Sequence, residues 1–211
     1  MIEVHAKEEI PSEEYRRMVL TLMDKQASRE IATAEVFGQC IVHAPGYEDK
    51  KRLTRFQMEE LKHFKLLSRL MADLGVDMDA YVQDRALAGG GATGQQEMGI
   101  ADRLEATLFN FLIDRAATYQ LREYTRGSYI PLAKANDSIL KDEEGHKNFG
   151  EECLVQMCQD PATRQLIQER LAKWFRSSLR IFGRAGTPGN RYCLEVGLKP
   201  RDSGQVAAAF V

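Results

Sequence analysis

The sequence has few of the features that mark secreted, membrane-bound or nucleic-acid-binding proteins. No apolar run approaches the roughly 20 residues that a transmembrane helix needs, and the first residues lack the basic start and apolar core of a signal peptide. The chain carries 29 lysines and arginines against 31 acidic residues, which gives a formal net charge of −2 and excludes a generally basic surface. We therefore expect a cytoplasmic protein that binds neither membranes nor nucleic acids.

Cysteine and strand signals are also scarce. The four cysteines form no Cys-x-x-Cys pair, which argues against a zinc knuckle and against a rubredoxin-type iron site. In a reducing compartment such thiols need no partner, and we assign them no function. No convincing alternation of apolar and polar residues predicts a β-strand anywhere in the 211 residues.

What the sequence does contain is a helical pattern, with apolar residues recurring every three or four positions. Five long helices are expected, and they cover residues 12–43, 47–74, 100–126, 128–157 and 161–182. A shorter helix is expected at 77–87, and the glycine-rich residues 89–94 are expected to form the long crossover between two helix pairs. The fold class is thus an all-α four-helix bundle with an extra C-terminal helix in residues 1–183, followed by an irregular tail over 184–211.

Two of these helices carry the same short motif. Glu60 and His63 stand three positions apart in the second helix, and Glu143 and His146 have the same spacing in the fourth. Residues three apart lie on the same face of an α-helix, so each motif presents a carboxylate and an imidazole side by side. Taken alone, such a motif is usually a solvated accident or a satisfied core histidine, but both motifs here lie on apolar stripes.

An acidic residue precedes each motif at nearly the same distance. Glu30 lies 30 residues before Glu60, and Asp114 lies 29 residues before Glu143, and both are placed among apolar residues of their helices. Glu105 competes with Asp114, but its longer distance from Glu143 breaks this symmetry. The repeated half-site is typical of a four-helix bundle that holds a carboxylate-bridged pair of metal ions.

Four carboxylates that converge inside a bundle need cations, because isolated ionised groups in an apolar interior cost several kcal/mol each. Mixed oxygen and nitrogen ligands with open positions suit iron or manganese better than structural zinc. We therefore predict a site for two iron ions, or manganese in their place. Its six expected ligands, also the candidate catalytic residues, are Glu30, Glu60, His63, Asp114, Glu143 and His146.

Other charged residues near these helices receive a plainer interpretation. Four acidic residues fall off the apolar stripes and are expected to be solvated or to support the ligands: Glu35, Glu59, Asp142 and Glu144. Three basic residues could meet an anionic substrate, although a solvated face is the default expectation for Arg115, Arg122 and Lys147.

At these residues the chain resembles the phenylacetic acid catabolic branch of the ferritin-like superfamily, and most closely its catalytic, metal-binding members. The resemblance runs from about Glu14 to Phe182 and rests on the six-ligand pattern with an aspartate in the third helix. It also includes residues 141–146 and the aromatic fifth helix from Lys173 to Gly183. The sequence departs from relatives in the second helix, where Leu61-Lys62 stands in place of a frequent Ala-Gly pair.

This resemblance implies a ferritin-like fold in which the six ligands bind a di-iron centre. The reduced centre would activate O2 and insert one oxygen atom into an organic substrate, in this family an aromatic acyl-CoA such as phenylacetyl-CoA. The expected partners are a small-molecule substrate, O2, an electron-donating reductase, and either further copies of this chain or a related structural subunit.

Three alternatives remain open from the sequence. Another di-iron hydroxylase could act on a different substrate, although a tRNA-modifying one should show a basic face. An iron-storage or peroxide-handling protein would have the same ligands, but the extra helix and tail do not suit a simple ferritin cage. A scaffold protein would keep the fold without the activity, against which all six ligand positions count.

Overall fold

The computed structural model describes residues 3–87 and 99–211, and the expected crossover at residues 89–94 lies outside them. In chain order the elements are η1 (Lys7–Glu9), α1 (Glu13–His43), α2 (Tyr47–Asp73), α3 (Met78–Leu87), α4 (Arg103–Tyr124), α5 (Ile130–Met157), α6 (Pro161–Leu179), η3 (Arg180–Phe182), α7 (Pro188–Glu195) and α8 (Ser203–Phe210). The five long helices and the short helix after α2 are confirmed, with small shifts at their ends.

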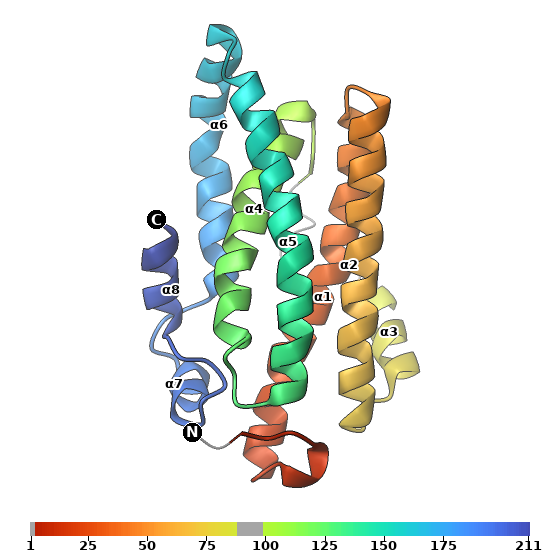
Figure 1. Cartoon of the computed structure of the whole chain (residues 1–211), viewed down its shortest axis with the longest axis vertical. Helices are drawn as coiled ribbons and strands as arrows, with labels where there is room; N and C mark the ends of the chain where they lie inside the picture. Colours follow the sequence, from red (N-terminus) through yellow and green to blue (C-terminus); the bar gives the residue numbers. More distant parts are fainter. Residues whose placement is uncertain (1–2, 88–98) are drawn as a thin grey trace.

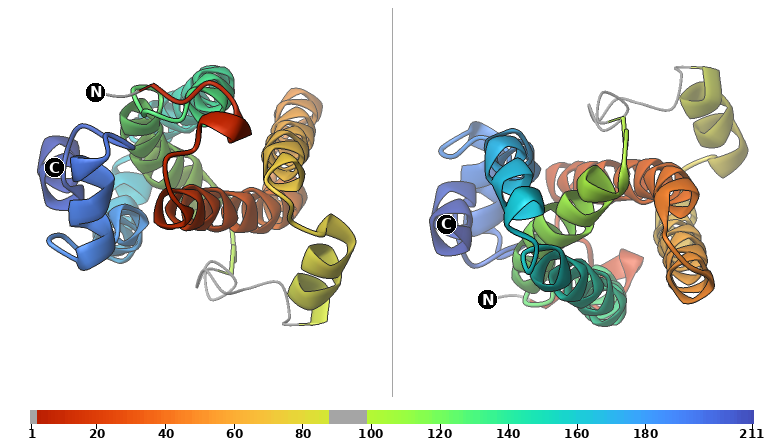
Figure 2. Two further views of the ribbon diagram at one scale, coloured as in Figure 1. Left: turned by 90° about the horizontal axis from the view of Figure 1, so that it is seen from below. Right: turned by 90° about the horizontal axis from the view of Figure 1, so that it is seen from above.

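Four long helices form the body of the molecule (Figure 1). Helices α1 and α2 pack along each other as one antiparallel pair, and α4 and α5 form the second pair. Helix α2 contacts α5 and α1 contacts α4, which closes the bundle, while α6 packs on the outer side of α4 (Figure 2). The architecture is an all-α, ferritin-like bundle with an additional C-terminal helix, as predicted.

Local signals in the sequence set the helix ends. The Ser12 side chain accepts a hydrogen bond from the backbone N–H of Tyr15, and Asp160 does the same for Thr163 before a proline in the first turn of α6. Gly75 follows α2 at φ 86°, a left-handed conformation that glycine adopts without a Cβ clash. Ser12, Gly75 and Asp160 are also the residues from which the sequence predicts these ends.

The expectation of an irregular tail over residues 184–211 is wrong, because this segment contains α7 and α8. Helix α7 begins with Thr187 as its capping residue and a proline in its first turn. Helix α8 begins with a capping box, in which Asp202 and Gln205 satisfy each other's backbone N–H groups. Each helix has only eight residues, which is too short to show a clear 3.6-residue apolar period.

Phe210 in α8 ties this segment to the bundle. Its ring is fully buried, and it stacks on Phe175 at 5.9 Å between centroids and meets Tyr119 edge-on at 5.8 Å. Aromatic pairs at such distances contribute about 0.5–1.5 kcal/mol each beyond the burial of their area. The C-terminal segment is therefore a packed part of the fold.

Two clusters of buried apolar residues fill the bundle, and a polar layer lies between them. Along α2, Phe56 belongs to one cluster and Leu67 to the other, with Glu60 and His63 between them. The same order recurs on α1 and α5. The predicted ligands thus occupy a layer in the middle of the bundle, held by apolar packing above and below.

Candidate metal centre

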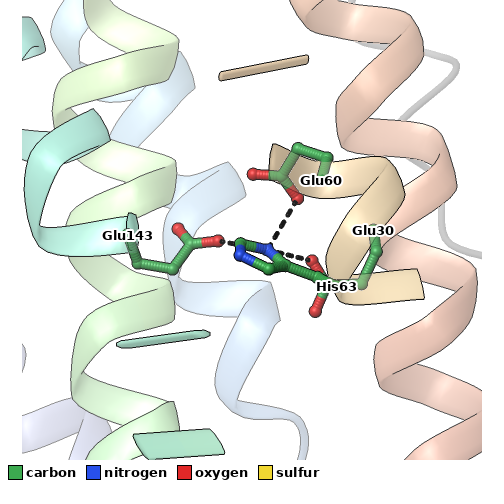
Figure 3. A group of neighbouring side chains, drawn as sticks. All are labelled: Glu30, Glu60, His63 and Glu143. Atoms are coloured by element: carbon green, nitrogen blue, oxygen red, sulfur yellow. Dashed lines mark ion pairs between the residues drawn. The ribbon is translucent and has the colours of Figure 1, made fainter. Parts of the chain in front are cut away.

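Four of the predicted ligands converge in the polar layer (Figure 3). Glu30 from α1, Glu60 and His63 from α2, and Glu143 from α5 each offer a ligand atom, and these atoms all lie within 4.8 Å of one another. All four residues are buried. His63 Nδ1 lies 3.5 Å from Glu30 Oε2 and 3.8 Å from Glu60 Oε2, so the three side chains face a common point.

His146 lies beside this cluster. Its Nδ1 is 3.2 Å from Glu60 Oε1 and 3.8 Å from Glu143 Oε2, which places Glu60 between the two imidazoles. Asp114 on α4 lines the same cavity as Glu30, Glu60 and Glu143, and only 1% of its surface is exposed. The structure therefore brings five of the six predicted residues into direct proximity and places the sixth in the wall of the same cavity.

Several polar atoms of this layer are buried without a hydrogen-bond partner. They are Glu60 Oε1, His63 Nδ1, Asp114 Oδ2 and His146 Nδ1. A buried polar atom left unsatisfied costs roughly 1–3 kcal/mol, so such a group of them needs an explanation. Imidazole nitrogens and carboxylate oxygens aimed at one another fit the donor set of a metal pair.

The pKa shifts in the layer also fit a site for metal cations. Burial and the neighbouring carboxylates raise the pKa of Glu60 and of Glu143 well above the usual range, and burial with the charge of Glu143 does the same for the pKa of Asp114. Burial would lower the pKa of His63, but the Glu30 and Glu60 carboxylates raise it to about 12. The layer is thus rich in carboxylates whose negative charges need to be balanced, either by bound protons or by metal cations.

Each histidine is held from behind by a carboxylate. His63 Nε2 donates to Asp142 Oδ2 at 3.0 Å, and His146 Nε2 donates to Glu59 Oε2 at 3.0 Å. The arrangement is crossed, because each carboxylate directly precedes the glutamate of one motif and bonds the histidine of the other. A carboxylate behind a ligating histidine fixes its tautomer and leaves Nδ1 free to bind metal.

Two of the four acidic residues that fall off the apolar stripes, Glu59 and Asp142, thus support the ligand histidines. Glu144 instead pairs with Arg122 at 3.0 Å near the surface. Glu105, the rejected competitor of Asp114, pairs with Lys173 at 2.9 Å away from the centre. An acidic residue immediately before each motif is a signal in the sequence, but the crossing between helices is not.

One further contact was absent from the sequence predictions. Gln26 lies one turn before Glu30 on α1, and its side-chain amide donates to Glu30 Oε1 at 3.1 Å. The bond orients the glutamate and leaves its Oε2 toward His63. A spacing of four residues on a helix could have indicated this pair.

An inner cavity of about 80 Å3 adjoins the carboxylates. Its wall includes Glu30, Glu60, Asp114 and Glu143, and apolar side chains such as Ile113 complete it. At about 30 Å3 per water in the liquid, this volume holds two or three waters or a molecule of similar size. Small molecules therefore fit beside the carboxylates.

The whole chain matches a known family. The model of the family described as "Phenylacetic acid catabolic protein" covers residues 1–210. The chain belongs to this family. It is also similar to one of the subunits of 1,2-phenylacetyl-CoA epoxidase from Escherichia coli K12, with 25% identity over 173 residues. That alignment covers 80% of this chain and 55% of the relative, so the chain spans little more than half of the relative's length.

The membership agrees with the resemblance that the ligand pattern indicated. In this family member, Glu30, Glu60, His63 and Glu143 form a buried cluster that could hold a metal ion. Among the residues that the structure describes, no helix is both long enough and apolar enough to cross a membrane.

Proposed function

We propose that this chain is the catalytic part of a non-haem di-iron monooxygenase. The observation that carries the proposal is the polar layer, in which two Glu-x-x-His motifs from α2 and α5 face each other with orphaned imidazole and carboxylate atoms. Membership in the phenylacetic acid catabolic protein family supports the same reaction class.

The charge of the layer favours two cations. Four carboxylates carry four negative charges when ionised, and two divalent ions balance them. The six residues that would hold the ions are Glu30, Glu60, His63, Asp114, Glu143 and His146. Iron is the proposed metal because O2 chemistry requires a redox-active ion, and manganese shares the same ligand preferences.

The chain's own residues would position and shield the centre. Each imidazole would hold the metal through Nδ1, since its Nε2 already donates to Asp142 or to Glu59. Rings of Phe37 and Phe56 lie 5.2 Å and 4.4 Å from the ring of His146 and exclude water from that side. Once bound and reduced, the iron pair would supply the electrons that activate O2 for transfer of one oxygen atom to an organic substrate.

The substrate and partners are proposed from the relative. Its name describes an epoxidase of phenylacetyl-CoA, and we propose an aromatic acyl-CoA as the substrate class for this chain. We further propose an external reductase as the electron source, because the centre must be reduced for each turnover. The relative is one subunit of an enzyme, so we propose that this chain works as an oligomer, with itself or with a related structural subunit.

The test is metal content. Full-length protein produced with ample iron should contain about two irons per chain, and a His63→Ala/His146→Ala variant should lose them. The chain has two further histidines, so His5→Ala/His43→Ala is a matched control, with His43 bound to the Ile100 carbonyl away from the layer. Circular dichroism establishes that each variant is folded. Folded wild-type protein that binds no iron would refute the proposal, and iron binding would justify an assay of O2 consumption with phenylacetyl-CoA and a reductase.

A further inference from the structure

A second, larger cavity lies outside the metal layer. It measures about 520 Å3 and is formed by α1, α4, η3 and the C-terminal segment that carries α7 and α8. Ligand pockets for small molecules typically span about 300–1,000 Å3, which this chamber meets and the inner cavity does not. The two cavities share a wall made of Leu22, Lys25, Arg29, Gln120, Tyr124 and Ile181. The chamber therefore adjoins the inner cavity directly.

The charge of this outer chamber has one sign. Its lining contains four basic residues and no aspartate or glutamate, although the whole chain has a net charge of −2. The basic residues are Lys25, Arg29, Arg184 and Lys199, and we call the cavity that they line the cation chamber. In the part of the chain that the structure describes, none of the four lies within 4.0 Å of a carboxylate oxygen.

Lys199 shows that this is more than a solvated basic face. Only 8% of its surface is exposed, and its ammonium group donates to the neutral hydroxyl of Ser203 at 3.1 Å. A lysine is almost never buried to this extent unless it is paired, since an uncompensated buried charge costs several kcal/mol. A buried ammonium in the wall of a chamber is suited to receive an anion from that chamber.

Arg29, in the wall between the two cavities, is likewise held by neutral hydrogen-bond acceptors. Its guanidinium donates to Gln120 Oε1 at 2.8 Å and to the Ile181 carbonyl at 3.1 Å, which are both neutral acceptors. The planar guanidinium has five N–H donors and matches carboxylate and phosphate geometry. Arg29 thus lies between the chamber and the centre, and it has N–H donors beyond the two that these bonds use.

Three basic residues that lie near the chamber in sequence or on the same helices have partners, in contrast to these four. Arg122 on α4 contacts Glu144 at 3.0 Å, and Arg201, close to Lys199 in sequence, donates to Glu123 at 3.0 Å. Arg115, one of the three basic residues considered from the sequence, lies over the rings of Phe210 and Tyr119 instead. The fold thus gives these neighbouring cations direct partners. Carboxylates act on the chamber cations only from beyond 4.0 Å, Asp202 and Glu123 on Lys199 and Glu30 on Arg29, so their N–H donors can still take an anionic ligand.

We propose that the cation chamber binds the anionic group of the substrate, a phosphate or a carboxylate, with Arg29 and Lys199 as its anchors. The reacting end of the same molecule would then lie toward the inner cavity and the metal layer. This second clause rests on the proposed function, whereas binding of the anion does not. The C-terminal segment contributes Arg184 and Lys199, so it belongs to the substrate site.

Calorimetric titration of the full-length, metal-free protein tests the site with two probes, inorganic pyrophosphate and phenylacetate. We expect at least one to bind, and we expect Lys199→Met to weaken that binding roughly tenfold to a hundredfold, as for the loss of a charged hydrogen bond. Arg29→Met should have the same effect, and exposed Lys25→Met provides a variant that does not disturb a buried group. Arg122→Met is the control, because that cation is already paired outside the chamber.

The outcomes separate the possibilities. Binding of pyrophosphate alone assigns the chamber to a phosphate-bearing substrate, and binding of phenylacetate alone assigns it to a free carboxylate. No binding of either probe at millimolar concentration overturns the proposal, as does binding that all three chamber variants leave unchanged. Because the titration needs neither metal nor turnover, its failure is distinct from a failure to find iron in the polar layer.

Discussion

The close approach of α4 and α5 gives the sharpest test of how the polar layer is built. Gly150 lies on α5 one turn after His146, and a Cβ there would stand 2.4 Å from the backbone nitrogen of Phe111 and 2.6 Å from the backbone carbon of Asn110. Backbone atoms cannot rotate away, so Gly150→Ala should force the two helices apart. Overpacking costs roughly 1–3 kcal/mol or more, and we take the upper end here. The helix propensity of alanine returns about 1 kcal/mol.

We therefore expect Gly150→Ala to lower the free energy of unfolding by about 2 kcal/mol, measured by urea denaturation. Gly145→Ala is the matched control on the same helix, because its Cβ would meet nothing within 4 Å. That variant should gain about 0.5–1 kcal/mol. The separation of α4 from α5 should also reduce iron content in Gly150→Ala alone. Equal stability changes in the two variants would refute the packing argument.

Three further predictions concern the ligand supports, the C-terminal segment and the hydrogen bonding at the end of the bundle. Asp142→Asn should weaken metal binding about tenfold to a hundredfold against a competing chelator, because the asparagine no longer fixes the His63 ring. The Asp142 side chain is 41% exposed, so the variant should fold, and an unchanged metal affinity would contradict its supporting role. Phe210→Ala should cost about 3–5 kcal/mol in urea denaturation, and a cost below about 1 kcal/mol would mean that α8 is not part of the core. Tyr15→Phe removes a buried hydrogen bond of 2.8 Å to Ser128 and should lower stability by about 1 kcal/mol; no shift in the thermal midpoint would count against that bond.

The sequence predicted the main helices well because their signals are local and periodic. Long helices that bury one face show their period over many turns, and Ser12, Gly75 and Asp160 mark ends through their own backbone preferences. The candidate ligands are predicted for a related reason. A glutamate and a histidine three apart must share a face, whatever the rest of the chain does.

The features that the sequence did not predict depend on contacts between distant segments. The crossed bonds from Asp142 to His63 and from Glu59 to His146 require knowing that α2 and α5 face each other. The burial of Lys199 depends on how the C-terminal segment folds over the bundle, and an eight-residue helix carries too little pattern to reveal that. Residue type indicated what these side chains can do, and only the packing assigned them partners.

The two apolar clusters explain why the polar layer can be tested without destroying the fold. Each long helix of the bundle crosses from one cluster to the other, so packing on both sides fixes the position of the layer between them. On α5, Ile139 lies in one cluster and Phe149 in the other, and Glu143 and His146 stand between these anchors. A substitution within the layer removes no residue of either cluster. Loss of iron in a histidine variant that circular dichroism shows to be folded would therefore report on ligation, since the residues of the apolar clusters that position the helices are all still present.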